Sequence, residues 1–152
     1  MAQTNRIEEH TASEVNQRIE EQSHNNVLGY AAQGKEAISK RIEELDAEWD
    51  VERALMTGAG VNVLFGVAMG AFVNRKWFNW PAIVGAFMLQ HTLQGWCPPL
   101  IPFRRSGVRT SHEIEREKTA LRILRGDFEN VASGSGDDAT AHAEAAWQAA
   151  KF

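Results

Sequence analysis

Two long stretches of the chain carry no formal charge, and they constrain the fold more than any other feature. No Asp, Glu, Lys or Arg occurs at residues 54–73, and after Arg75 and Lys76 none occurs at residues 77–103. A helix needs about 20 residues to cross about 30 Å of hydrocarbon. The pattern predicts an all-α protein built on a two-span transmembrane helical hairpin over residues 54–103.

The aromatic residues that flank these stretches favour the same interpretation. Trp77 and Trp80 lie beside the short connection, and Trp96 lies near the far end of the second stretch. Amphipathic aromatic rings are typical of the membrane–water boundary. A soluble chain of 152 residues could hardly cover two helices that are apolar on all sides.

The basic residues near the hairpin predict its orientation. Arg75 and Lys76 are the two at the tip, whereas eight lie on the outer flanks: Lys40, Arg41, Arg53, Arg104, Arg105, Arg109, Arg116 and Lys118. Under the positive-inside rule this bias predicts a multi-pass membrane protein with both termini in the cytoplasm. We expect the following residues to contact lipid headgroups: Arg104, Arg105, Arg109, Trp77, Trp80 and Trp96.

Small and polar residues recur at helical spacing in both stretches and predict how the helices pack. The first row is Gly58, Asn62, Gly66 and Gly70, and the second is Ala82, Ala86, Gln90 and Gln94. Helices in lipid associate through close packing of small residues and through interhelical hydrogen bonds. Asn62 and Gln90 lie at similar depth in an antiparallel pair, so we expect them to meet each other or their copies in a neighbouring subunit.

The residues outside the hairpin predict helical segments on the cytoplasmic side. Residues 1–34 form a polar helical segment, and residues 35–53 form an amphipathic helix that leads into the membrane. Residues 104–131 form a basic juxtamembrane segment with a further helix, and residues 132–152 form a flexible linker and an Ala-rich helix. The net charge of 16 − 20 = −4 argues against a nucleic-acid partner.

An apolar stripe marks the helix before the membrane: Ile38, Ile42, Leu45 and Trp49. Such a stripe cannot face water alone, so we expect a short coiled coil with a second copy or packing on another helix of the same chain.

Two stretches outside the membrane fit the capping-box pattern that opens a helix. Thr11 and Glu14 form the first pair, and Thr110 and Glu113 form the second. The helix that the second pair opens is a candidate partner for the apolar stripe, because Ile114 and Leu121 lie on one side of it.

Residues 44–128 also resemble a known family. The strings LDAEWDVER, LQHTLQGWCPP, RRSGVRT and ALRILRGDF carry the likeness. They resemble a family of small bacterial inner-membrane helical-hairpin proteins of unknown function. The hairpin, with its Gly95-Trp96-Cys97-Pro98 ending, is also similar to the membrane anchor of membrane-bound rhodaneses. The resemblance implies an inner-membrane hairpin, and it carries no sulfurtransferase activity over because no rhodanese domain accompanies it.

Few residues are candidates for chemistry. Cys97 is the only cysteine, and the nearby Arg104 and Arg105 would favour its thiolate, although a packing role at a helix end is the simpler interpretation. The polar residues within the hairpin are Asn62, Gln90, His91 and Gln94. His91 has no acidic partner there, and we expect a neutral, hydrogen-bonded histidine. We expect no metal and no cofactor.

These observations predict a non-catalytic integral membrane protein. It would be a homo-oligomer or a subunit of a larger membrane complex, and it would act as a structural or accessory subunit or as a scaffold. One alternative is a persulfide carrier or thiol-dependent accessory protein that uses Cys97. Another is a small pore or carrier lined by the polar residues of the hairpin.

Overall fold

The computed structural model describes residues 4–128 and 146–147, and within them the chain is all-helical, with no strand. The predicted linker and C-terminal helix at residues 132–152 lie outside the described residues, apart from 146–147. In chain order the elements are α1 (Thr4–Glu9), α2 (Ser13–Ala31), α3 (Lys35–Ala47), α4 (Val51–Phe72), η1 (Arg75–Phe78), α5 (Asn79–Gln94), α6 (Leu100–Arg105) and α7 (Ser111–Arg125).

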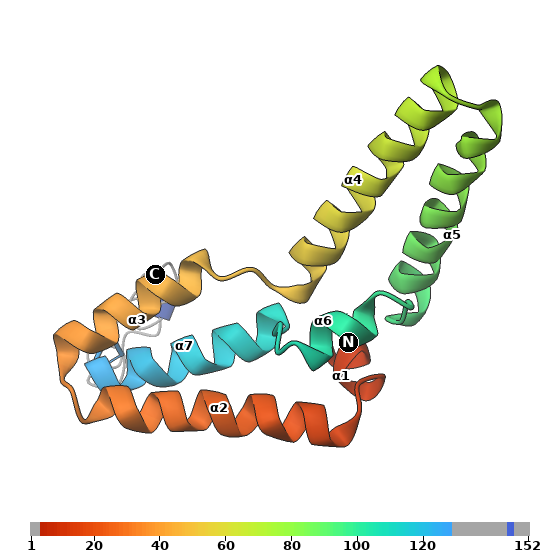
Figure 1. Ribbon diagram of the computed structural model, residues 1–152. Helices are drawn as coiled ribbons and strands as arrows, with labels where there is room; N and C mark the ends of the chain where they lie inside the picture. The colour runs from red at the N-terminus through yellow and green to blue at the C-terminus, as the bar shows by residue number, and fades with distance from the viewer. Residues whose placement is uncertain (1–3, 129–145, 148–152) are drawn as a thin grey trace. The chain divides into compact units, whose positions relative to one another are not determined.

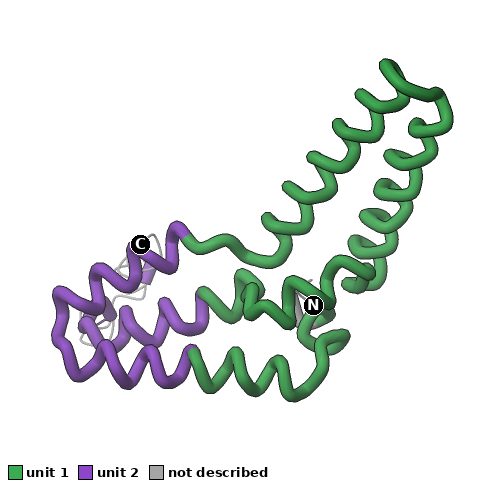
Figure 2. Tube along the Cα trace, viewed as in Figure 1, with its two compact units in different colours: residues 1–22, 48–114 green, residues 23–47, 115–152 purple. Residues whose placement is uncertain are grey.

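The chain forms two compact units, shown in Figure 2. The first comprises residues 1–22 and 48–114, and the second comprises residues 23–47 and 115–152. The first unit contains α4, η1, α5 and α6 together with the N-terminal segment. The second contains α3, the end of α2 and most of α7.

The first unit contains an antiparallel hairpin made of α4 and α5, with the 3₁₀ helix η1 at its tip (Figure 1). Asn74 begins η1, because its side chain accepts a hydrogen bond of 2.9 Å from the Lys76 amide. At the other end, α5 stops at Gly95, whose left-handed conformation (φ 74°) is one that glycine adopts without strain. The Gly95 amide donates to the His91 carbonyl.

Residues 48–50 interrupt the helix that was predicted to run from residue 35 into the hairpin, so this prediction was wrong. Asp50 is the N-cap of α4, and its carboxylate accepts a hydrogen bond of 2.6 Å from the Arg53 amide. The Val51 amide donates to the Arg109 carbonyl at 2.8 Å. A strong N-cap and a long-range backbone bond therefore replace the helical hydrogen bonds at this point.

The core of the first unit lies at the base of the hairpin. Its buried members come from four segments of the chain: Ile7, Val51, Leu55, Cys97 and Leu100. Trp96, Phe103 and Val108 pack against them. The base of the hairpin is thus a small hydrophobic core of its own, which joins α1 and α6 to the first turns of α4.

In the second unit, α3 and α7 each bury apolar residues, and charged side chains join the two helices. Ile38, Ile42 and Leu45 of the predicted stripe are buried within the chain, as is Leu121 of α7. This burial agrees with the intrachain alternative and not with the coiled coil between copies. Trp49, the fourth residue of the stripe, lies beyond the end of α3 and is exposed.

Charged side chains also connect α7 to α2 and α3 in the second unit. Arg41 Nε donates to Glu117 Oε1 at 3.0 Å, and Asn26 donates to the same oxygen. Lys118 Nζ contacts Asp46 Oδ1 at 2.7 Å. Glu117 and Lys118 are both buried, and these contacts supply the partners that buried charges require.

Among the described residues, one helical stretch, within Lys35–Phe72, is long and apolar enough to cross a membrane, with a mean hydropathy of 1.6 over its apolar window. The apolar part is α4, which has 22 residues. The second helix, α5, has 16 residues and is shorter than the about 20 residues of a perpendicular span. The length and composition of the helices thus identify one candidate span where the sequence predicted two.

Candidate functional site

Gly66 and Gly70 of α4 are the points of closest approach within the hairpin. A Cβ atom at Gly66 would lie 2.6 Å from Pro81 Cδ, and one at Gly70 would lie 2.9 Å from the Phe78 ring. Both glycines are buried although they lie on a helix with mostly exposed side chains. They are two of the predicted packing residues, and here they allow the tip of the hairpin to close.

The other two predicted packing residues of α4 make no such contact. A Cβ atom at Gly58 would meet nothing within 4 Å. Asn62 is exposed, and its Nδ2 donates to the Gly58 carbonyl of its own helix at 2.9 Å. Within this chain the Asn62 amide group therefore donates to its own helix and not to Gln90 as predicted. The alternative contact with a neighbouring copy stays a prediction.

The face of α5 that approaches α4 differs from the predicted row. Three of the four predicted residues are exposed: Ala82, Ala86 and Gln94. Pro81 contacts Gly66, and Val84 and Met88 line the space between the two helices. The residues that face α4 are thus not the predicted row of small and polar residues. The bulky side chains of Phe78 and Pro81 fit against the glycines of α4 instead.

Two further polar residues of α5, Gln90 and His91, are half-buried. The Nδ1 atom of His91 is buried and has no hydrogen-bond partner within the part of the chain that the structure describes. The predicted hydrogen bond between helices through this imidazole is thus not made by Nδ1.

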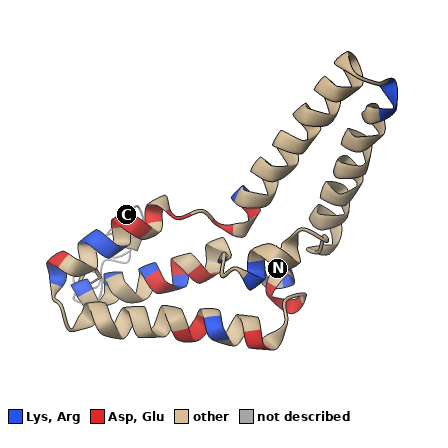
Figure 3. Ribbon diagram, viewed as in Figure 1, with Lys and Arg blue, Asp and Glu red and all other residues tan. Residues whose placement is uncertain are grey.

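The tip of the hairpin carries aromatic and basic residues. The Trp77 ring stands edge-on to Phe65 with ring centroids 5.9 Å apart. Trp77 and Trp80 are both exposed. Arg75 and Lys76 form the charged patch at the tip in Figure 3, and the helices below the tip are uncharged as far as their bases.

Arg104 is the centre of a buried polar network at the base of the hairpin. Only 1% of this residue is exposed. Its guanidinium donates to both carboxylate oxygens of Glu113 at 2.7 Å, to Asn16 Oδ1 at 2.9 Å and to the Val108 carbonyl at 3.0 Å. Its Nε donates to Thr11 Oγ1 at 3.2 Å. Arg104 therefore connects the N-terminal segment to the segment that follows the hairpin.

Glu113 is held in this network by a capping box. The Thr110 amide donates to Glu113 Oε2 at 2.7 Å, and the Glu113 amide donates to Thr110 Oγ1 at 3.2 Å. The predicted capping box at the start of α7 is confirmed. The one predicted at Thr11 and Glu14 is wrong, because Thr11 Oγ1 donates to the Ile7 carbonyl instead and α2 begins at Ser13.

A second arginine predicted to contact lipid is also paired inside the fold. Arg109 is buried and forms a two-pronged ion pair with Glu48, in which its Nε lies 2.7 Å from Glu48 Oε1. The headgroup assignment was thus wrong for Arg104 and Arg109, since both guanidinium groups are turned toward carboxylates of the chain. Arg105 is exposed and keeps its predicted role as an expectation. Charge composition alone did not reveal Glu113 and Glu48 as the partners.

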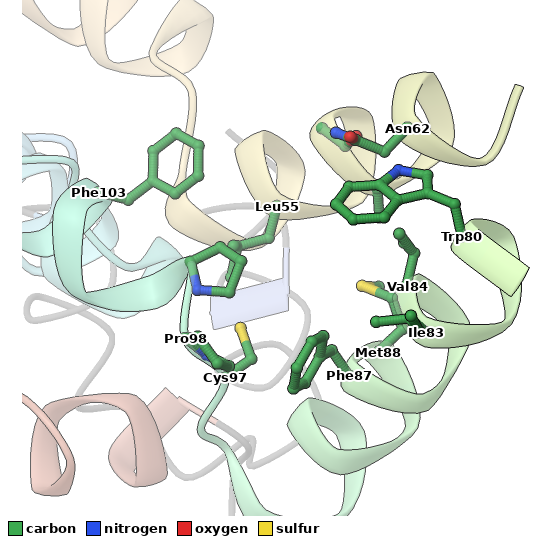
Figure 4. A pocket seen from close by; sticks show the side chains of 13 residues that line it. Leu55, Asn62, Trp80, Ile83, Val84, Phe87, Met88, Cys97, Pro98 and Phe103 are labelled. Atoms are coloured by element: carbon green, nitrogen blue, oxygen red, sulfur yellow. The ribbon is translucent and has the colours of Figure 1, made fainter. Parts of the chain in front are cut away.

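An apolar cavity of about 370 Å³ lies between α4, α5 and the segment that follows α5. Its walls are α4 from Leu55 to Asn62, α5 from Trp80 to Met88, and residues 97–103 (Figure 4). Cys97 lines it but is 97% buried, with an exposed fraction of only 3%. Of the two cationic side chains expected to favour its thiolate, Arg104 is paired with Glu113 and Arg105 is exposed.

Comparison of the chain with protein-family models, curated proteins and solved structures found no match. The resemblance of residues 44–128 to bacterial inner-membrane hairpin proteins therefore stays a prediction.

Proposed function

We propose that α4, η1 and α5 insert into a lipid bilayer as a two-span hairpin, and that the protein is a non-catalytic structural or accessory subunit or scaffold. The site of action is the hairpin itself. Residues 1–53 and 104–128 would then form the part of the protein in the aqueous phase on one side of the bilayer. The bilayer is the partner that this proposal commits to first.

The observation that carries the proposal is the large apolar surface that the chain leaves uncovered. On α4, Leu64 is 71% exposed and Phe72 is 88% exposed, and on α5, Leu89 and Leu93 are 62% and 67% exposed. Only 17% of the 18-residue apolar window within Lys35–Phe72 is buried by the rest of the chain. Exposed patches of this kind mark surfaces that bind a membrane or another protein.

The short length of α5 is compatible with a second span. Its 16 residues rise about 24 Å, against a hydrocarbon thickness of about 30 Å. Tryptophan residues lie at both ends of this helix, where the missing length would have to be made up. Trp77 and Trp80 are exposed at one end, and Trp96 is half-buried at the other. Tryptophan rings are stable at the interface, so a span that begins and ends with them needs fewer purely apolar residues.

The distribution of charge supports an orientation with both termini in the cytoplasm, and the bacterial inner membrane is the location that the resemblance of residues 44–128 implies. The basic tip consists of Arg75 and Lys76, and the opposite end carries Arg53 and Arg105 as exposed cations. The eight-to-two excess in the flanks follows the positive-inside rule.

The sulfur-carrier alternative depends on an accessible thiolate at Cys97. The burial of this thiol and the pairing of Arg104 with Glu113 support a packing role instead. A Cys97→Ser protein is the direct test, and a scaffold should tolerate the substitution. The pore alternative requires polar residues along a shared path, and the cavity between the helices has Asn62 as its only amide-bearing lining residue among those described.

The proposed scaffold role predicts an assembly larger than one chain. The protein would be extracted from membranes in a mild detergent, its mass would be measured by light scattering, and co-purifying proteins would be identified. We expect a protein mass well above the 16.9 kDa of one chain. A 16.9-kDa monomer that brings no partner with it would overturn the scaffold role, even if the hairpin inserts into lipid.

A further inference from the structure

The cavity between the two helices of the hairpin has a lining that fits one class of ligand. It is lined by α4, α5 and residues 97–103, and this lining is apolar except for the Asn62 amide, the Trp80 indole N–H and the Cys97 thiol. Its volume of about 370 Å³ lies in the usual range for ligand pockets, about 300–1,000 Å³. A space with so few polar groups in its lining offers few hydrogen-bond partners to water molecules, so water would not fill it stably.

Three cationic side chains lie at the same end of the hairpin as the cavity. Arg53 is two residues before the lining residue Leu55, and Arg105 is two residues after the lining residue Phe103. The Arg6 guanidinium donates to the Leu93 carbonyl at the end of α5. Among the described residues, no carboxylate lies in ion-pair distance of these three arginines, in contrast to Arg104 and Arg109.

We infer that this cavity binds one acyl chain of an anionic phospholipid, whose headgroup lies at the basic end of the hairpin. The inference rests on the proposed insertion of the hairpin into a bilayer. The chain supplies apolar walls for a hydrocarbon tail and, for a phosphate, three arginines that form no ion pair among the described residues, of which Arg53 also stacks on the Trp49 ring. A phospholipid of the cytoplasmic leaflet has both groups in this order. In this proposal the acyl chain fills the space between α4 and α5 on the side of Gly66 away from the tip.

Gly58 allows the cavity to be filled without disturbing the fold. A Cβ at Gly58 meets nothing within 4 Å, and the residue lines the cavity. Gly60 is a matched control, because its Cβ also meets nothing but it does not line the cavity. Gly58→Leu and Gly60→Leu therefore change the helix propensity and the apolar volume of α4 in the same way. Only the Gly58→Leu side chain would lie in the cavity.

The test is native mass spectrometry of the proteins after mild detergent extraction from phosphatidylglycerol vesicles. We expect wild type and Gly60→Leu to retain one phosphatidylglycerol per chain, and we expect Gly58→Leu to bind it at least about tenfold more weakly, which corresponds to about 1.4 kcal/mol. Equal retention by the two variants would overturn the cavity as the site. Equal retention of phosphatidylcholine with the same acyl chains would overturn the anionic headgroup.

A second measurement needs no substitution. A trace of phosphatidylglycerol with a diazirine in its acyl chain would be added to the wild-type protein in detergent micelles, and the labelled peptides would be sequenced. We expect labelling to concentrate on residues 97–103 and on the cavity-lining face of α4. Labelling spread evenly over exposed residues such as Leu64 and Leu89 would overturn the site.

Failure of the underlying membrane proposal gives a different result. If alkaline carbonate releases the wild-type protein from membranes, the insertion of the hairpin is wrong and the lipid site falls with it. If the protein resists carbonate but retains no phospholipid, only the lipid site is wrong.

Discussion

At the scale of single residues, Arg104 is the side chain on which the base of the hairpin depends most. Its guanidinium pairs with Glu113 and bonds to Asn16 in the buried interior of the first unit. We expect Arg104→Leu to lower the free energy of unfolding by roughly 3–5 kcal/mol, because removal of one partner leaves the other charge buried and uncompensated. Thermal unfolding followed by circular dichroism in detergent measures this loss.

Arg105→Leu is the matched control for this substitution. Arg105 is adjacent in sequence but exposed, and the structure pairs it with no carboxylate among the described residues. Its replacement should change the stability by no more than about 0.5 kcal/mol. Equal effects of the two substitutions would show that the Arg104 network does not hold the base together.

Glu113 gives the stability of the protein a defined pH dependence. Burial raises the pKa of its carboxyl, but hydrogen bonds from Arg104 and Thr110 outweigh burial, and the pKa lies below its usual value of 4.5. Such a group stabilises the fold above its unfolded pKa, and this contribution is lost as the pH falls through the lower folded pKa. We expect wild type to exceed Glu113→Gln in melting temperature at pH 7, and we expect the difference to shrink below about pH 4.5. A difference that is constant from pH 7 to pH 3 would contradict this role.

The sequence predicted the local partner of Glu113 but not its distant one. The Thr110 and Glu113 capping box follows from a spacing of three residues, and the structure confirms it. Arg104 was assigned to lipid because it lies in a basic cluster beside an apolar stretch. Its pairing depends on the tertiary fold, which brings Asn16 and Glu113 next to Arg104. No local spacing of residues predicts these contacts.

At the scale of elements, the hairpin is held by glycines that admit bulky residues of the opposite segment. Gly66→Ala places a methyl group 2.6 Å from Pro81 Cδ, and we expect it to cost roughly 1–3 kcal/mol by overpacking. Gly60→Ala meets open space and should instead stabilise α4 by roughly 0.5–1 kcal/mol. Melting temperatures that shift in the same direction for both variants would contradict the proposed contact.

The break between α3 and α4 depends on a single cap. Asp50→Ala removes the acceptor of the Arg53 amide, and we expect a loss of roughly 1 kcal/mol of stability. Asp50→Asn keeps a good capping side chain and should cost only a few tenths of this amount. Chemical unfolding in detergent would rank the two variants, and an equal loss in both would show that the charge of Asp50 matters and its hydrogen bond does not.

The helices themselves were largely predictable, and their boundaries and contacts were not. Apolar runs and capping residues located α4, α5 and α7. The break at residues 48–50 was missed because residues 35–53 were predicted as one amphipathic helix, and the capping role of Asp50 was not considered. The face of α5 was missed because a row of small residues was expected to oppose the glycines, whereas Phe78 and Pro81 fill that space.

At the scale of the whole molecule, the segregation of charge along the chain predicted two features that the structure shows, an all-helical chain and an apolar helix long enough to cross a membrane. Among the described residues, Asp, Glu, Lys and Arg are absent from α5 and from α4 after Arg53. They lie at the tip of the hairpin, at its base, in the N-terminal segment and in the second unit (Figure 3). The sequence expectation of two spans rests on residues 77–103, which the structure divides into η1, α5, an exit segment and α6. Proline and glycine in this stretch shorten the second helix to 16 residues.

The central claim is that the tip of the hairpin lies across a bilayer from the rest of the chain. Single cysteines at Asn74→Cys and at Ser13→Cys, each in a Cys97→Ser background, would be exposed to a membrane-impermeant maleimide in intact spheroplasts and again after the membrane is opened. We predict that Asn74→Cys is labelled in intact spheroplasts and that Ser13→Cys is labelled only after opening. Labelling of both positions only after opening would contradict the account.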